Sequence, residues 1–193
     1  MPYRLRIALL LIPVLLAGCL SATPPSNYYL LTAEAPDTPS GTSPSIGVGP
    51  IRVPEYLNRN GIVHLREGNQ LQVSQFERWA EPLLDGIQRV MSINLAGELD
   101  TQSIQAFPWP RSRKPDYAVK LAVLGLDAGH TEARLVAEWV LSRPQTGEIV
   151  ERRISRLQTP ITGEFSPAKI APAYSELLYQ LSAEIASQIE RNP

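Results

Sequence analysis

The chain has 193 residues, of which 44% are hydrophobic, and a formal net charge of −1 at pH 7. This length suits one domain with a buried core. The near-neutral charge, without a stripe of Lys and Arg, argues against a nucleic-acid binder. Cys19 is the only cysteine, so the sequence excludes a disulfide within the chain and a metal site built from cysteines.

The first 18 residues are typical of a secretory signal peptide. Two arginines precede an apolar run over residues 7–16, which is shorter than the roughly 20 residues that a membrane-spanning helix needs. The segment LAG stands directly before Cys19, and the four residues together resemble the lipobox of bacterial lipoproteins. The resemblance implies cleavage after residue 18, a diacylglycerol on the thiol and an N-acyl chain on the new amino group. The alternative is an ordinary signal peptide with a chance cysteine.

The lipobox divides the chain into three parts. Residues 1–18 are the expected signal peptide, residues 19–26 a lipidated, Pro-containing tether, and residues 27–193 the folded domain. Leu20 follows the lipidated cysteine. In lipoprotein sorting, the absence of Asp at that position favours the outer membrane, so the resemblance implies an outer-membrane anchor.

The first half of the domain is expected to hold four strands and a helix. The strands lie in residues 27–32 and 46–53 and in a hairpin over residues 61–74, whereas the Pro-rich residues 33–45 form a loop. At Gly49-Pro50 the apolar alternation changes phase, which predicts a β-bulge on an edge strand. Apolar residues then recur at helical spacing over residues 82–99.

The second half is expected to hold three long strands and a final helix. Alternating apolar residues and turn signals place the strands at residues 116–126, 131–142 and 148–157. The last helix is capped by Ser166, and its regular part begins near Ala171 because Pro172 interrupts the first turns. This order predicts an α+β fold, with a mostly antiparallel sheet and two helices packed on one face.

Several stretches resemble one family, in the same order along the chain. They are YYLL (residues 28–31), IGVGPIRVPEYLNRNGIV (46–63), FERWAEPLLDGIQRVMSINLAG (76–97), Trp109-Pro110, DYAVKLAVLGLDA and LVAEWVL. Together with the lipobox, they are similar to the PqiC/YmbA-type intermembrane transport lipoproteins, the auxiliary lipoprotein component of ABC-type and MCE-type transport systems. The resemblance also implies a domain like the N-terminal domain of TolB-like proteins.

The resemblance implies a function and partners as well. It describes a non-enzymatic lipoprotein on the periplasmic side of the outer membrane, with no cofactor beyond the lipid on Cys19. Its partners would be an MCE-domain protein that spans the periplasm and an inner-membrane component, which together move phospholipid or other hydrophobic material. A homo-oligomer is possible within this description. Two other functions stay open: a periplasmic module that carries lipid or another ligand itself, and, least favoured, an envelope hydrolase.

Two segments contain candidate docking residues. Arg78 and Trp79 lie in the densest mixture of aromatic and charged residues, and such residues are common interface anchors. Arg52, Tyr56 and Leu57 follow or end the predicted edge strand, where a partner strand could pair. In both segments the alternative is structural: Trp79 fills the core beneath a helix, and the loop around Tyr56 is simply packed.

Other possible sites receive less support. His64 and His130 are the only histidines, lie far apart in the sequence, and have no marked carboxylates beside them, so a metal site is not expected. Residues 107–110 (FPWP) are either an exposed hydrophobic knob or a core plug. The motifs of serine hydrolases, zinc proteases, P-loops and dinucleotide-binding folds are missing from the sequence.

Overall fold

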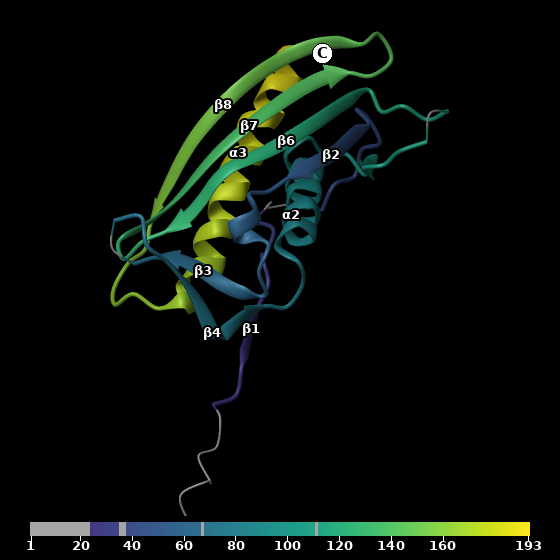
Figure 1. The fold of residues 1–193 in the computed structure, drawn as a ribbon. Helices are drawn as coiled ribbons and strands as arrows, with labels where there is room; N and C mark the ends of the chain where they lie inside the picture. The colour runs from purple at the N-terminus through teal and green to yellow at the C-terminus, as the bar shows by residue number, and fades with distance from the viewer. Residues whose placement is uncertain (1–23, 35–37, 67, 111) are drawn as a thin grey trace, which may run out of the picture.

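The computed structural model describes residues 24–34, 38–66, 68–110 and 112–193. The signal peptide, Cys19 and most of the expected tether therefore lie outside the described residues. The described residues form two sheets and two α-helices (Figure 1). The strands are β1 (Asn27–Tyr29), β2 (Ile46–Arg52), β3 (Gly61–Leu65), β4 (Leu71–Trp79), β5 (Ile104–Ala106), β6 (Tyr117–Ala128), β7 (Glu132–Arg143) and β8 (Glu148–Pro160). The α-helices are α2 (Leu83–Glu98) and α3 (Ile170–Arg191), and two 3-10 helices are η2 (Glu55–Leu57) and η3 (Pro167–Lys169).

The α+β class is confirmed, and the long pairings β6–β7 and β7–β8 are antiparallel as expected, but the strands form two mixed sheets instead of one. The small sheet has the order β1-β4-β3, and the large sheet has the order β5-β2-β6-β7-β8. β1 pairs with β4 in parallel, and β2 pairs with both β5 and β6 in parallel, whereas β3–β4, β6–β7 and β7–β8 are antiparallel. The alternation of apolar residues identifies strands but does not select their neighbours, which explains the error.

β2 contains the predicted bulge. Its pairing with β6 shifts register between Val48 and Ile51, and the shift brings Ile46, Val48 and Ile51 to the core. The expected edge position is wrong for the first part of β2, because the unforeseen short strand β5 pairs with Ile46–Val48. Pro50 lies two residues beyond Val48, the last residue that pairs with β5, so its missing N–H removes no bond to that strand.

Both helices pack on one face of the large sheet. The β7 residues Leu135, Ala137, Trp139 and Leu141 face them and are at most 1% exposed. The indole Nε1 of Trp139 donates to Ser155 Oγ at 2.9 Å, so its polar atom is satisfied inside the core. Ser182 of α3 contacts the Met91 sulfur of α2 at 3.2 Å, where the helices meet.

The last helix begins as the sequence predicts. Ser166 Oγ accepts from the backbone N–H of Ala168 at 3.3 Å, Pro167 opens η3, and α3 starts at Ile170. The hairpin of β3 and β4 is also confirmed, although β4 continues to Trp79 and joins β1.

The small sheet lies at one end of the molecule and the C-terminal residues at the other (Figure 1). The same view shows β6, β7 and β8 as long curved strands that pass in front of α3. The helices therefore cover one side of the large sheet and leave its other side uncovered.

Candidate functional site

The five predicted docking residues differ in their exposure. Leu57 is 2% exposed and Trp79 is 8% exposed, and both belong to the hydrophobic core. The docking prediction is therefore wrong for these two side chains, because a surface anchor must be reachable by a partner. For Trp79, the structural alternative is confirmed. Arg52 is exposed, while Tyr56 and Arg78 are partly exposed.

Tyr56 and Trp79 belong to one chain of contacts through the interior. The Tyr56 hydroxyl donates to Asp127 Oδ1 at 2.9 Å and accepts from the backbone N–H of Leu126 at 3.2 Å. The Tyr174 hydroxyl donates to the Leu126 carbonyl at 3.1 Å, and its ring stacks on Trp79 with centroids 6.2 Å apart. These contacts connect η2, β6, α3 and β4, so they fasten the small sheet to the large one.

Burial raises the pKa of Tyr56 to about 12, and the hydrogen bond to the Asp127 carboxylate also raises it, while the bond from the Leu126 N–H acts in the opposite direction. Burial likewise raises the pKa of Tyr174 well above its ordinary value. Both phenols therefore stay protonated at neutral pH and serve as hydrogen-bond donors inside the fold.

Arg52 lies on the side of the large sheet that faces away from the helices. Register places it in one row across the sheet with Ala122, Glu138 and Ile154. Since successive side chains on a strand alternate between the two faces, the outward residues of the four strands share one surface, here called the open face. Its members are Arg52, Lys120, Ala122, Arg134, Val136, Glu138, Val140, Arg152, Ile154 and Arg156, with Leu124 at the β6 bulge.

The open face combines unpaired positive charge with apolar surface. Arg152 pairs with Glu138 at 3.3 Å, and Arg134 pairs with Glu132. Arg52, Lys120 and Arg156 are exposed and have no acidic partner among the described residues. Leu124 and Ile154 are each about half exposed. A groove of about 320 Å³ runs between the side chains of Arg52, Lys120 and Arg152, so the surface is also shaped.

The sequence indicates that individual residues of β6 and β8 point outward, but not that they share the open face. Lys120, Arg152 and Arg156 stand at the polar positions of alternating strands, which is where outward side chains are expected. Their shared location required the register between β2, β6, β7 and β8, which no local pattern supplies. Arg78 lies elsewhere, in the small sheet, where its Nε donates to the Gln75 carbonyl at 3.2 Å.

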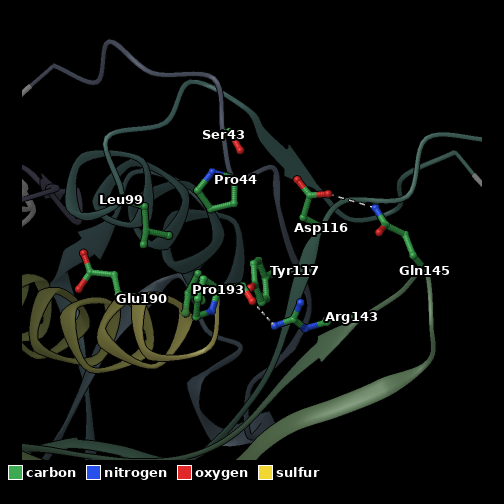
Figure 2. Close-up of a pocket in the computed structure, with 10 residues that line it drawn as sticks. Ser43, Pro44, Leu99, Asp116, Tyr117, Arg143, Gln145, Glu190 and Pro193 are labelled. Carbon is green, nitrogen blue, oxygen red and sulfur yellow. Dashed lines mark hydrogen bonds between the residues drawn. The ribbon is translucent and has the colours of Figure 1, made fainter.

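A second concave site lies at the end of the domain that holds the C-terminus. This pocket has a volume of about 500 Å³ and includes Pro44, Leu99, Asp116, Tyr117 and Arg143 in its wall. Figure 2 shows Arg143 directed at Pro193 and Asp116 directed at Gln145. The lining comes from segments far apart in the sequence, so no motif could have indicated this site.

The charged side chains of this pocket form hydrogen bonds with other parts of the same chain. Arg143 donates to the carbonyls of Asn192 at 2.7 Å and Pro193 at 3.0 Å, and its guanidinium carbon lies 5.0 Å from the Tyr117 ring centroid. Asp116 accepts from the backbone N–H and hydroxyl of Ser45, at 2.9 and 2.7 Å, and these bonds lower the pKa of its carboxyl. The polar groups of the pocket therefore hold the fold together at this end.

The two histidines are brought together by the fold. Phe165 lies between them, with ring centroids 5.4 Å from His64 and 4.9 Å from His130. Burial and, to a smaller extent, the nearby His130 lower the pKa of His64. Within the described part of the chain, no group of three or more His, Cys, Asp and Glu side chains is placed to hold a metal ion.

The FPWP segment (residues 107–110) is partly an exposed hydrophobic knob and partly packed against the fold. Phe107 is 45% exposed, whereas Trp109 packs on Gly47 of β2, where an added Cβ would lie 2.8 Å from its ring. The Phe107 and Trp109 rings meet edge to face at 5.2 Å.

Several known proteins are similar to this chain in sequence or in fold. The chain is 26% identical over 184 residues to the intermembrane transport lipoprotein PqiC of Escherichia coli K12, covering 92% of this chain and 94% of that protein. The PqiC of Shigella flexneri matches to the same extent. A solved structure from Xanthomonas campestris superposes with a TM-score of 0.68 at 16% identity, over 83% of this chain and 93% of that one. A second solved structure, of an uncharacterized protein, gives 0.70 at 20% identity, over 86% and 99%.

The family match agrees with a periplasmic lipoprotein associated with a membrane. Over the described ranges, neither α2 nor α3 combines the length and hydropathy needed to cross a bilayer. The model of the ABC-type transport auxiliary lipoprotein component matches residues 28–186, which is nearly the whole folded domain. The chain therefore belongs to the family of ABC-type transport auxiliary lipoprotein components.

Proposed function

We propose that this chain is the outer-membrane-anchored auxiliary lipoprotein of an MCE/ABC-type intermembrane lipid transport system. Its role is to dock a partner and not to catalyse a reaction. The lipobox at Cys19 supports the anchor, since several acyl chains hold a protein stably on a bilayer. Leu20, in place of Asp after the lipidated cysteine, supports sorting to the outer membrane. The family match supports the transport system.

In this proposal the open face is the docking surface. Its composition is the main observation that supports the proposal. The face leaves Arg52, Lys120 and Arg156 without acidic partners, next to the exposed Leu124 and Ile154. Apolar anchors among complementary charges are typical of protein interfaces. The partner is therefore expected to present an acidic surface, and the proposed partner is the MCE-domain protein that spans the periplasm, bound in turn to an inner-membrane component.

The interior of the domain does not favour the alternative in which it carries lipid itself. Such a module needs an apolar cavity of several hundred Å³. The space between sheet and helices is filled by large buried side chains, among them Trp139, Tyr174 and Leu135. The pocket of about 500 Å³ lies at the end of the domain, and its arginine binds the chain's own C-terminal carbonyls.

Anchoring and docking can be separated by substituting Cys19. Cys19→Ser removes the proposed lipid attachment but leaves every residue of the open face unchanged. We expect the variant to be lost from the outer-membrane fraction, while the purified folded domain still binds the purified MCE-domain protein as the wild type does. Arg52→Glu with Lys120→Glu should give the reverse: normal membrane attachment and binding weakened at least tenfold. Equal binding by the wild type and the charge-reversed variant would contradict the proposed surface.

A further inference from the structure

Tyr28 and Leu30 are exposed apolar residues at the start of the folded domain. Burial alternates over residues 28–31: Tyr28 is 64% and Leu30 51% exposed, whereas Tyr29 packs against the core and Leu31 is 2% exposed. The inward residues fix the strand, because Ala80 donates to the Tyr29 carbonyl at 2.9 Å and Arg89 to the Leu31 carbonyl at 2.9 Å. The outward side chains are thus held on the surface by the backbone and have no role in the core.

A positive charge lies beside this apolar pair. Tyr28 is the register partner of Arg78 in β4, and the Arg78 side chain is partly exposed, with the Gln75 carbonyl as its hydrogen-bond acceptor. The adjacent acid, Glu77, accepts from the Asn27 amide at 3.0 Å and interacts with the Tyr29 hydroxyl. Tyr28, Leu30 and Arg78, here called the Tyr28 patch, therefore combine an aromatic ring with a polar end, an aliphatic side chain and a cation.

The chain length fixes how far this patch lies from the proposed lipid anchor. Tyr28 lies nine positions after Cys19, and an extended chain spans at most about 3.3–3.6 Å per residue, so Tyr28 stays within about 32 Å of the anchored Cα. At such a short tether, even a weak contact forms often, because it is intramolecular. Figure 1 shows β1 at the tip of the domain, at the opposite end from the C-terminal residues.

We propose that the Tyr28 patch rests on the headgroup layer of the bilayer that holds the anchor. Tyrosine favours the boundary between water and hydrocarbon, an exposed leucine gains by leaving water, and arginine pairs with lipid phosphate. The contact would hold the domain upright, with the small sheet toward the membrane and the open face free for a partner. The proposal rests on the lipid anchor of the proposed function, but not on the identity of the docking partner.

The test uses the single cysteine to rebuild the anchor. A chain that begins at Cys19 keeps the whole core, which starts at Leu31, and its only thiol can be coupled to a maleimide lipid in vesicles of phosphatidylethanolamine and phosphatidylglycerol. Tyr28→Trp places a fluorophore in the patch. Leu124→Trp is the matched control, at a position that is 50% exposed on the open face. Both spectra are read against the coupled wild type.

We expect the Tyr28→Trp emission to shift to shorter wavelength on coupling and to be quenched by brominated phospholipid, with neither change for Leu124→Trp. Leu30→Asp with Arg78→Glu, added to Tyr28→Trp, should abolish the quenching while the circular dichroism of the domain is unchanged. Absence of quenching at position 28, or equal quenching at positions 28 and 124, would overturn the proposal. Either result would leave the binding test of the docking partner unaffected.

Discussion

Tyr56 shows how a side chain expected at a docking surface can instead be fixed by the fold. Its hydroxyl bridges Asp127 and the Leu126 backbone, and Tyr174 holds the carbonyl of the same Leu126. Mutation of Tyr56 therefore affects stability before it affects any partner. A loss of docking in a Tyr56 variant should be interpreted only after its stability has been measured.

The raised pKa of Tyr56 makes stability depend on pH in the alkaline range. An unfolded tyrosine loses its proton near pH 10, but folded Tyr56 does so only at about 12. The unfolded state is therefore favoured by proton release in this window, and the stabilisation present below pH 10 is lost as the pH rises towards 12. We expect the free energy of unfolding to fall across this window, and less steeply in Tyr56→Phe.

Urea denaturation on either side of pH 10 measures this effect. At neutral pH, Tyr56→Phe should cost about 1–3 kcal/mol, since it leaves the partly buried Asp127 carboxylate and the Leu126 N–H without the hydroxyl. Tyr28→Phe is a suitable control because that side chain is 64% exposed. An alkaline slope as steep in Tyr56→Phe as in the wild type would show that other groups cause it.

The structural role of a single residue can be predicted from the sequence where it depends only on nearby residues. Ser166 caps the last helix, and Gly49-Pro50 marks the bulge, because both effects act within a few residues. The solvent exposure of individual side chains cannot be predicted in this way. Trp79 and Arg78 are neighbours in the sequence, yet one is in the core and the other is partly exposed. Which of them faces inward depends on α3 and on Tyr174, nearly 100 residues later.

The packing of β2 requires a residue without a side chain at Gly47. A Cβ added at Gly47 would lie 2.7 Å from the Pro115 ring and 2.8 Å from the Trp109 ring. β2 lies between β5 and β6 at this point, so it has little room to move. The Trp109 segment can cover the strand only because the glycine has no side chain.

Gly47→Ala should therefore destabilise the domain by about 1–3 kcal/mol, as overpacking does in other cores. Thermal and urea unfolding measure the change. Gly129→Ala is the matched control, because the nearest atom to its Cβ would lie 3.8 Å away, and we expect about 0.5 kcal/mol or less there. Trp109→Leu in the Gly47→Ala background should restore part of the loss. A Gly47→Ala variant as stable as the wild type would rule out the tight packing described.

The elements themselves were largely predictable, but their assembly was not. The long strands β6, β7 and β8 and both helices follow from apolar periodicity and turn residues. β5 was missed because three residues are too few to show a period. The separation into two sheets was missed because parallel pairs such as β1–β4 join segments 50 residues apart.

Across the whole molecule, three surfaces have different expected roles. The small sheet carries the Tyr28 patch beside the tether, the open face carries unpaired cations, and the far end holds the C-terminus and the pocket of Figure 2. The open face could not be predicted as a unit, because its members come from four strands and meet only through their register. The family, in contrast, was recognisable from sequence stretches that run through the folded domain.

The docking claim is tested most directly by site-specific photo-crosslinking in the native envelope. A photoreactive residue at Ile154 probes the open face, and one at Ile93, equally exposed on α2, probes the helix layer. We expect Ile154 to yield a covalent adduct with the MCE-domain protein, the adduct to be lost when Arg52→Glu and Lys120→Glu are added, and Ile93 to yield none. Adducts with that protein from Ile93 but not from Ile154, or from neither position, would contradict the account.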